Sequence, residues 1–393
     1  MKQRYYLHEL GIINALGSGV AEVSQRLLEG DTSGMVLEDN LLISGQARVG
    51  RARGELPMVP DHLMHFNCRN NQLLLNAFAQ IEHAFEAAVT RYGRSRIGVV
   101  LGSSTTGMAE GEAAFSALRL TGSLPATYHY TQQEIGAPAV FLAKYLKLNG
   151  PAYTVCTACT SSAKAFQSAR NLLRHGICDV VLVGGVDSLC RTTVNGFASL
   201  ESITTELTNP MSLNRRGINI GEGAALFLLS KEEAAIELLG IGESSDAYHM
   251  SAPHPEGRGA EQAMQSALND AGIAANAVGY LNLHATATPK NDEMESRAVA
   301  RVFPDGIATS GTKPLTGHTL GAAGATEIAF CMLALQANQL PPHIWDGNAD
   351  PSLPLLNLVN DKLAFKTNAA RICMSNSFAF GGSNASLIIS ENC

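Results

Sequence analysis

The stretch TACTSSAKAF, residues 157–166, follows the apolar run GPAYTV and predicts a strand that turns sharply into a helix. Cys159 lies at the break. A helix N-terminus presents unpaired backbone N–H groups and a partial positive charge, and both favour a thiolate over a thiol. The same N–H groups could hold the oxyanion of an acylated cysteine. We therefore expect Cys159 to be a nucleophile of lowered pKa, with a buried structural thiol as the alternative.

Short β-branched runs alternate with helical patterns on both sides of this stretch. The segment SSAKAFQSARNLLRHG at 161–176 has the apolar spacing of a helix and ends in glycine. Such alternation predicts an α/β fold built in layers. Four runs predict buried strands: RIGVVLGSS (96–104), CDVVLVGG (178–185), VGYLNLHATAT (278–288) and RICMSNSFAFGG (371–382).

The two halves of the chain resemble each other in pattern. A turn followed by a helix rich in small residues occurs at 153–169 and again at 315–330, and a pair of hydrophobic strands comes late in each half. This predicts an internal duplication with a boundary near residues 235–240. We expect an N-terminal half, 1–237, that carries the nucleophile and a C-terminal half, 238–393, that carries the two histidines described next.

Two histidines in the second half are candidate partners of the cysteine. His284 follows an apolar strand and could equally be a core histidine with satisfied hydrogen bonds. His318 stands among glycines, which let a backbone or a ligand approach closely. One cysteine and two histidines can form a nucleophile with two proton or hydrogen-bond partners, although the sequence alone does not bring them together. In NSFAFGGSN, 376–384, Gly381 and Gly382 fit either a tight turn or a mobile loop that places a backbone N–H beside the cysteine.

Composition excludes several classes of function. The 393 residues carry a net charge of −7, which argues against nucleic-acid binding. Eight scattered cysteines do not form a disulfide framework. The CTAC motif at 156–159 has no second pair of ligands at zinc spacing, so we expect neither a metal nor a redox role there.

The sequence also bears on location. The N-terminal residues show no apolar core of a signal peptide, and the longest candidate membrane span, ATEIAFCMLALQ at 325–336, is short and carries Glu327. We therefore expect no transmembrane segment and a cytoplasmic protein.

Four blocks together resemble, in order, the signature blocks of the β-ketoacyl-acyl-carrier-protein synthases, elongating condensing enzymes of the thiolase-like fold. They are TACTSS (157–162), NLHATATPKNDEMES (282–296), TKPLTGHTLGAAGATE (312–327) and NSFAFGGSNASL (376–387). The resemblance implies two pseudo-symmetric βαβαβ halves in an αβαβα layered arrangement. Variation elsewhere, as in RNNQLLLNAFAQI (69–81), is similar to the ketosynthases of aryl-polyene-type pathways.

The resemblance also implies roles for individual residues. It makes Cys159, His284 and His318 the catalytic triad, with Lys313 beside the second histidine and Glu327 in a supporting network. Phe380 would gate the acyl pocket and share the oxyanion hole with the Cys159 N–H. Thr286 and Thr288 would hold the pantetheine arm, with Phe378 close by. Where the family commonly has glycine after the first histidine this chain has Ala285, whose methyl we expect to narrow the malonyl site.

The implied reaction is a decarboxylative Claisen condensation of malonyl-carrier protein with an acyl group held on Cys159. It needs no metal and no cofactor of the chain's own, since the acyl carrier protein brings the phosphopantetheine. The family implies a homodimer, or a heterodimer with a ketosynthase-like chain-length partner. Three alternatives are open: that non-catalytic partner, which typically lacks the cysteine; a thiolase, which would need a second active cysteine late in the chain; and a structural binding module.

Overall fold

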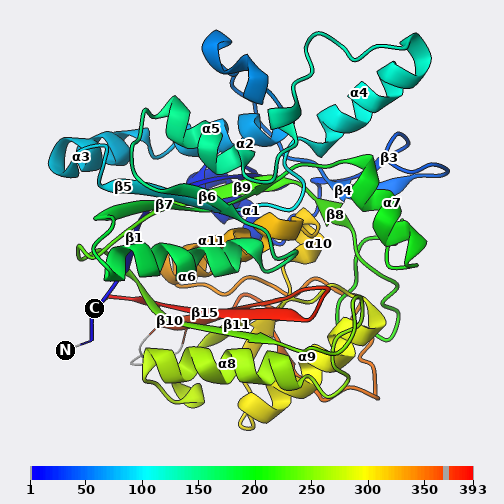
Figure 1. Ribbon diagram of the computed structural model, residues 1–393. Helices are drawn as coiled ribbons and strands as arrows, with labels where there is room; N and C mark the ends of the chain where they lie inside the picture. The colour runs from blue at the N-terminus through cyan, green and yellow to red at the C-terminus, as the bar shows by residue number, and fades with distance from the viewer. Residues whose placement is uncertain (1, 366–370, 393) are drawn as a thin grey trace.

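The computed structural model describes residues 2–365 and 371–392. In this part of the chain, twelve strands form one continuous hydrogen-bonded sheet, and its two halves face each other across a pair of central helices (Figure 1). The first half of the sheet comprises β1 (Tyr6–Asn14), β2 (Gly17–Ser18), β5 (Ile97–Gly102), β6 (Ala152–Val155), β7 (Val180–Asp187) and β9 (Gly223–Ser230). The second comprises β10 (Ile236–Ser245), β11 (Tyr280–Asn282), β12 (Ala308–Ser310), β13 (Asn357–Leu358), β14 (Ile372–Phe378) and β15 (Ser383–Glu391).

The two halves repeat one strand order. In the first, β6, β5 and β7 are parallel, and β9 and β1 continue antiparallel. In the second, β12, β11 and β14 are parallel, and β15 and β10 continue antiparallel. A short antiparallel pairing of β1 with β10 joins the halves. This repetition is the pseudo-symmetry that the sequence pattern predicted.

The central layer consists of α6 (Ser161–Arg174) and α11 (Ala323–Ala337), which lie between the two sheet halves (Figure 1). Their backbones approach so closely that a Cβ on Gly324 would come within 2.7 Å of the backbone nitrogen of Ala163. The helical stretch Leu320–Ala337 is apolar and long enough to cross a membrane, but 89% of it is buried inside the protein. The expectation that no stretch reaches this length is therefore wrong, yet the burial identifies the stretch as a core helix.

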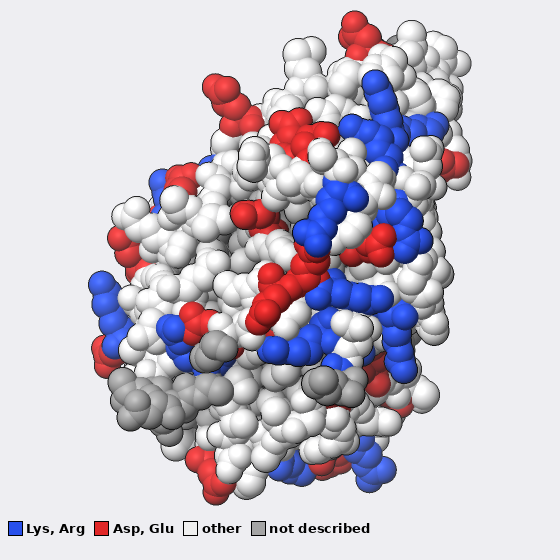
Figure 2. All heavy atoms as spheres, turned by 90° about the vertical axis from the view of Figure 1, so that its left-hand side faces the viewer, with Lys and Arg blue, Asp and Glu red and all other residues white. Residues whose placement is uncertain are grey.

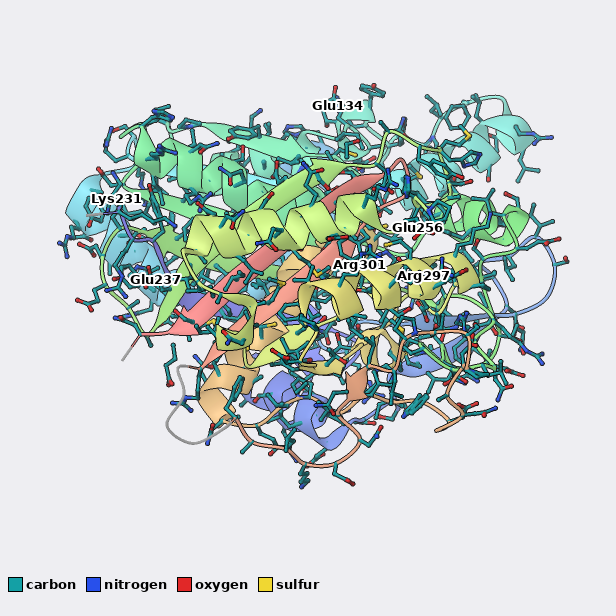
Figure 3. All side chains as sticks on the ribbon, turned by 90° about the horizontal axis from the view of Figure 1, so that it is seen from below. Glu134, Lys231, Glu237, Glu256, Arg297 and Arg301 are labelled. Atoms are coloured by element: carbon teal, nitrogen blue, oxygen red, sulfur yellow. The ribbon has the colours of Figure 1, made fainter. Side chains whose placement is uncertain are left out.

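Helices also cover the outer faces of the sheet. On one side α2 (Arg69–Ala79) and α5 (Ala137–Tyr145) pack on the first half, and on the other α8 (Arg258–Ala271) and α9 (Pro289–Val302) cover the second. Seen from below, α9 carries Arg297 and Arg301 toward the N-terminal end of α8 (Figure 3), where Arg301 pairs with Glu261 at 2.7 Å. The layers thus follow the order α, β, α, β, α.

The remaining elements pack beside these five layers or project from them. A small sheet joins β3, β4 and β8, and α4 projects from the body of the molecule (Figure 1). On the face shown in Figure 2, lysines and arginines lie beside acidic residues and form no broad basic area. The bounds are α1 (Val20–Glu29), β3 (Met35–Glu38), β4 (Ala47–Gly50), α3 (Glu82–Tyr92), α4 (Met108–Thr121), α7 (Arg191–Ser199), β8 (Ile220–Gly221) and α10 (Lys313–Thr316).

The cysteines are free thiols throughout the described residues. Six of them are buried, whereas Cys156 is exposed just before the turn that carries Cys159. Cys393 lies outside the described residues. The chain therefore has no disulfide framework among the cysteines that the structure describes, as the scattered spacing predicted.

Candidate active site

The turn that carries Cys159 is held by its own side chains. β6 ends at Val155 and α6 begins at Ser161. Between them Ala158 adopts φ 52°, a left-handed conformation that makes the turn sharp. The Thr157 N–H donates to Oγ of Ser161 at 2.9 Å. Cys159 consequently stands at the break between strand and helix, as predicted, with 6% of its surface exposed.

The protonation of Cys159 differs from expectation. Burial raises the pKa of its thiol to about 11, and this effect exceeds the lowering by the Lys313 ammonium and by the backbone N–H groups of Phe380 and of Cys159 itself. The prediction of a lowered pKa is wrong because desolvation of the thiolate outweighs the helix N-terminus. The resting group is therefore a thiol that needs a nearby base.

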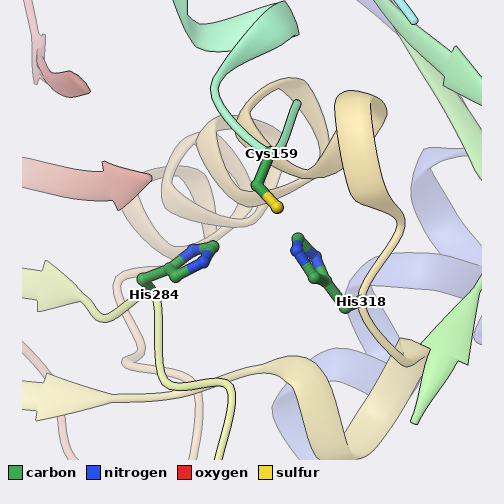
Figure 4. Close-up of side chains that lie close together, drawn as sticks. All are labelled: Cys159, His284 and His318. Carbon is green, nitrogen blue, oxygen red and sulfur yellow. The ribbon is translucent and has the colours of Figure 1, made fainter. Parts of the chain in front are cut away.

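His284 and His318 supply imidazoles at the cysteine. The sulfur of Cys159 and one ring nitrogen from each histidine all lie within 4.8 Å of one another. Figure 4 shows both rings directed toward the sulfur, His284 from the left and His318 from the right. The fold thus brings together residues from both of its halves, with the cysteine more than a hundred positions from either histidine.

His284 is fixed from its backbone side. It follows β11, and its N–H and that of Ala285 each donate to the carboxylate of Glu295 at 2.7 Å. Burial first, then the charges of Lys313 and His318, lower the pKa of His284 well below its usual value. The ring is therefore neutral at neutral pH.

The imidazole ring of His318 makes no hydrogen bond with the described residues. The backbone N–H of His318 donates to the carbonyl of Asn219 at 2.7 Å. Burial, together with the Lys313 charge, lowers the pKa of His318 well below its usual value as well. A buried neutral imidazole without a protein partner is available to bond a substrate atom.

Lys313 and Glu327 form a buried ion pair behind the histidines. Their Nζ and Oε1 atoms lie 2.5 Å apart, and burial raises the pKa of Glu327 to about 7 despite the lysine. The lysine also donates to the carbonyl of His284 and lies 3.4 Å from its Nδ1. Lys313 is therefore in contact with the first histidine, whereas the resemblance placed it beside the second.

Cys159, His284 and His318 offer enough ligand atoms to hold a metal ion, but their surroundings argue against one. A histidine that binds zinc almost always donates its other ring nitrogen to a carboxylate, carbonyl or water. Here Nδ1 of His284 faces the ammonium of Lys313, which would repel a cation. The geometry instead suits proton transfer and hydrogen bonding to a carbonyl oxygen.

A cavity of about 280 Å³ opens onto the triad. Oγ1 of Thr286 lies 2.9 Å from Oγ1 of Thr288 at its wall, and the Phe378 ring stands 6.1 Å from the His284 ring. The predicted residues that line the cavity are Cys159, His284, His318, Thr286, Thr288, Phe378 and Phe380. Its wall also includes Phe197 and Lys290, which the sequence did not single out.

Phe380 lies in the tight loop between β14 and β15. Gly381 and Gly382 have φ values of 86° and 77°, which favour glycine. The Phe380 ring packs on Phe197 of α7 with centroids 5.5 Å apart, and its backbone N–H acts to lower the pKa of the Cys159 thiol. Two N–H groups from different elements, those of Cys159 and Phe380, therefore act on the Cys159 sulfur, as the prediction of an oxyanion hole requires.

Ala285 does not narrow the cavity. Its side chain is fully buried and faces Gly311, where a Cβ would come within 2.4 Å of the Ala285 methyl. It is also absent from the cavity wall among the described residues. The Ala285 methyl therefore does not border this cavity, and its effect on a malonyl site stays a prediction.

Two acids that hold the site were not predicted. Glu295 anchors the backbone of the first histidine, as described above. Asp187, at the end of β7, accepts hydrogen bonds from the N–H groups of Ser104, Thr105 and Gly321, the last at 2.6 Å. It thereby ties the segment after His318 to the first half of the fold. The sequence did offer a signal for Asp187, because an acid stands there at the carboxyl end of a buried strand.

Comparison with known proteins points to the same family that the four sequence blocks resemble. Residues 69–235 match the beta-ketoacyl synthase N-terminal domain, and residues 235–345 match the C-terminal domain. The 3-oxoacyl-[acyl-carrier-protein] synthase 2 of Coxiella burnetii is 31% identical, with 99% of each chain covered. Nodulation protein E of Rhizobium meliloti strain 1021 is 30% identical, with full coverage of both chains.

Solved structures of ketosynthases have the same fold as this chain. The ketosynthase ApeO of Xenorhabdus doucetiae, determined in complex with its chain length factor ApeC, superposes with a TM-score of 0.95 at 45% identity, covering 99% of this chain and 98% of that one. The ishigamide ketosynthase/chain length factor superposes with a TM-score of 0.86 at 27% identity over the whole of both chains. With both domain models matched, a thiolase-like fold and a relative similar from end to end, this chain belongs to the β-ketoacyl synthase family.

Proposed function

We propose that the chain is a β-ketoacyl-acyl-carrier-protein synthase that carries its acyl chain on Cys159. The convergence of Cys159, His284 and His318 on one cavity is the observation that supports this most strongly. The family assignment and the 3-oxoacyl-acyl-carrier-protein synthase relatives support the same reaction.

The first half-reaction is acyl transfer. The Cys159 sulfur attacks the thioester carbonyl of an acyl-carrier protein, and its proton passes through a neutral imidazole to the departing pantetheine thiol. The N–H groups of Cys159 and Phe380 hold the oxyanion. Thr286 and Thr288, at the cavity wall, are placed to bind the pantetheine arm.

The second half-reaction forms the carbon–carbon bond. His284 and His318 donate hydrogen bonds to the thioester carbonyl of malonyl-carrier protein, and the enolate they stabilise forms as CO₂ leaves. Its carbon attacks the acyl-cysteine, and the sulfur departs as thiolate and takes up from water the one proton that the overall reaction consumes. Lys313 and Glu327 support the network by holding the first histidine. The chemistry requires no group beyond the phosphopantetheine of the carrier protein.

For partners we propose an acyl carrier protein and a second thiolase-like chain, either a copy of this chain or a chain-length partner. The heterodimer is supported by the Xenorhabdus ketosynthase, which forms a complex with its own chain length factor. We also propose an aryl-polyene-type pathway over housekeeping fatty-acid synthesis, which the sequence variation in residues 69–81 supports. We place the protein in the cytoplasm, and we divide it into halves 1–237 and 238–393, a division that the repeated strand order supports.

A non-catalytic chain-length subunit is the alternative function. Such subunits typically lack the nucleophile, whereas here Cys159 opens onto the cavity between both histidines. To test the proposal, the purified chain is incubated, alone and with a co-expressed chain-length partner, with a series of acyl-carrier proteins and malonyl-carrier protein. Products extended by two carbons support it, and their absence with every primer in both preparations contradicts it.

A further inference from the structure

A buried hydroxyl joins the nucleophile turn to the loop that carries Phe380. Oγ1 of Thr160, the residue after Cys159, lies 2.9 Å from Oγ of Ser383, the first residue of β15. The two residues are 223 positions apart in sequence and come from different halves of the fold. Their contact therefore connects the two elements that supply the N–H groups at the sulfur.

The direction of this hydrogen bond follows from the contacts of Thr160 with Thr157, whose own Oγ1 lies 3.0 Å from that of Thr160. The Thr160 hydroxyl lies 2.7 Å from the carbonyl oxygen of Thr157, which can only accept. Thr160 therefore donates its single proton to Thr157, and the hydroxyl of Ser383 donates to Thr160. The Thr160 side chain is fully buried, so water does not compete for the bond.

Ser383 also closes the loop around Phe380. The N–H of Ala379 donates to the Ser383 carbonyl at 2.8 Å. This bond closes a loop between Ala379 and Ser383, and Phe380 is the first residue within it. The other side of the loop is bonded to a different segment, through the Gly381 N–H and the Met250 carbonyl. Within the described residues, the bond from Ser383 to Thr160 is the one side-chain hydrogen bond between this loop and the nucleophile turn.

We propose that the Thr160–Ser383 hydrogen bond aligns the two halves of the oxyanion hole, an inference that rests on the proposed acyl transfer. Two donors stabilise one oxygen only if both lie within about 2.7–3.1 Å of it. One donor belongs to Cys159 and the other to Phe380, so their alignment depends on what connects the turn to the loop. Thr160 and Ser383 do not border the cavity. They are positioning residues for acyl transfer and have no direct part in decarboxylation, which depends on the histidines.

The test compares two half-reactions in Thr160→Val and Ser383→Ala. Single-turnover acylation of Cys159 by an acyl-carrier protein is followed by intact mass, and decarboxylation of malonyl-carrier protein is measured separately. Deleting an oxyanion-hole donor costs about 100- to 1000-fold, so misaligning one should slow acylation on the order of 10- to 100-fold. Decarboxylation should keep nearly its wild-type rate. Thr160→Ser and Ser383→Thr, which retain the hydroxyls, should restore acylation.

Ser168→Ala is the matched control, because it removes a hydroxyl from the same helix that bonds Tyr153 instead. It should leave both half-reactions unchanged. Thr160→Val also removes the bonds of this hydroxyl to Thr157, so its loss can exceed that of Ser383→Ala. In the double variant Thr160→Val/Ser383→Ala, the loss of acylation should match that of Thr160→Val alone, since the Ser383 hydroxyl then has no Thr160 partner left to lose. Wild-type acylation in both single variants would overturn the inference, as would equal loss of both half-reactions. A wild-type protein that never acquires the acyl group would instead overturn the proposed function beneath it.

Discussion

The imidazole rings of His284 and His318 meet edge to face, with their centroids 5.2 Å apart and their planes at 85°. Each comes from a different segment of the second half of the fold, and both are buried and neutral. Two neutral imidazoles can donate to one carbonyl oxygen without placing two positive charges side by side. This relationship explains how a single site can stabilise an enolate beside a nucleophilic sulfur.

Replacing His318 with alanine should harm decarboxylation more than acyl transfer. The variant loses one donor to the developing enolate, which costs roughly 100- to 1000-fold in rate, while His284 can still move the thiol proton. The two half-reactions are measured separately with malonyl-carrier protein and with acyl-carrier protein. Equal loss of both would show that the histidines do not divide their roles.

Replacing Cys159 with alanine should abolish chain elongation but leave decarboxylation measurable. The acyl chain then has no covalent attachment, while both imidazoles remain beside the cavity. The assay counts extended product and acetyl-carrier protein from the same incubation. Cys156→Ala is the matched control, because this cysteine is exposed and three residues away. Elongation near the wild-type rate in Cys159→Ala would contradict the assignment of the nucleophile.

Alkylation of Cys159 should accelerate with pH and show no plateau near neutrality. Because burial raises the pKa of the thiol to about 11, the thiolate fraction should grow roughly tenfold per pH unit below that value. The rate is measured with iodoacetamide between about pH 7 and about pH 9 on the Cys156→Ala background, by mass spectrometry of the Cys159 peptide. A rate that levels off around pH 7 would indicate a thiolate–imidazolium pair instead.

Replacing Lys313 with methionine should destabilise the protein, and more so at alkaline pH. Removing one partner of a buried ion pair costs about 3 to 5 kcal/mol. Without the ammonium, the pKa of Glu327, already raised to about 7 from 4.5, should rise further. The folded state then holds a proton that the unfolded state releases above pH 4.5, so stability is lost as pH rises.

Urea denaturation at pH 5 and at pH 8 measures this effect. The loss relative to wild type should be larger at pH 8, and Lys313→Met/Glu327→Gln should remove the difference between the two pH values. An equal loss at both pH values would mean that the buried carboxylate is not the group responsible.

We expect Phe380 to move when the enzyme is acylated. In the structure its ring rests on Phe197 at the cavity wall, and the glycines that follow allow the loop to swing. Crystal structures of the free and acylated enzyme should place the ring differently, and Phe380→Ala should slow acyl transfer because the loop loses its preferred position. An identical loop from 378 to 384 in both states, with the ring away from the acyl chain, would contradict a gate.

The turn at Cys159 and the internal duplication could be predicted from sequence, because both leave local patterns of apolar, small and glycine residues. The pKa of Cys159 could not, because its sign depends on how completely distant segments bury the sulfur. The same holds for Ala285: spacing places it beside His284, but the packing of its methyl against Gly311 depends on the tertiary fold. Contacts such as Thr160 with Ser383 depend on the docking of two halves, which no local pattern encodes.

The central claim is that an acyl group resides on Cys159 and leaves it by condensation, and a pulse and chase tests this most directly. The enzyme is loaded from an acyl-carrier protein, the Cys159 peptide is weighed, and malonyl-carrier protein is then added. We predict a mass increase of one acyl group on that peptide, followed by its loss together with the appearance of an equal amount of β-ketoacyl-carrier protein. A Cys159 peptide that never gains the acyl mass, or an adduct that malonyl-carrier protein does not remove, would contradict the account.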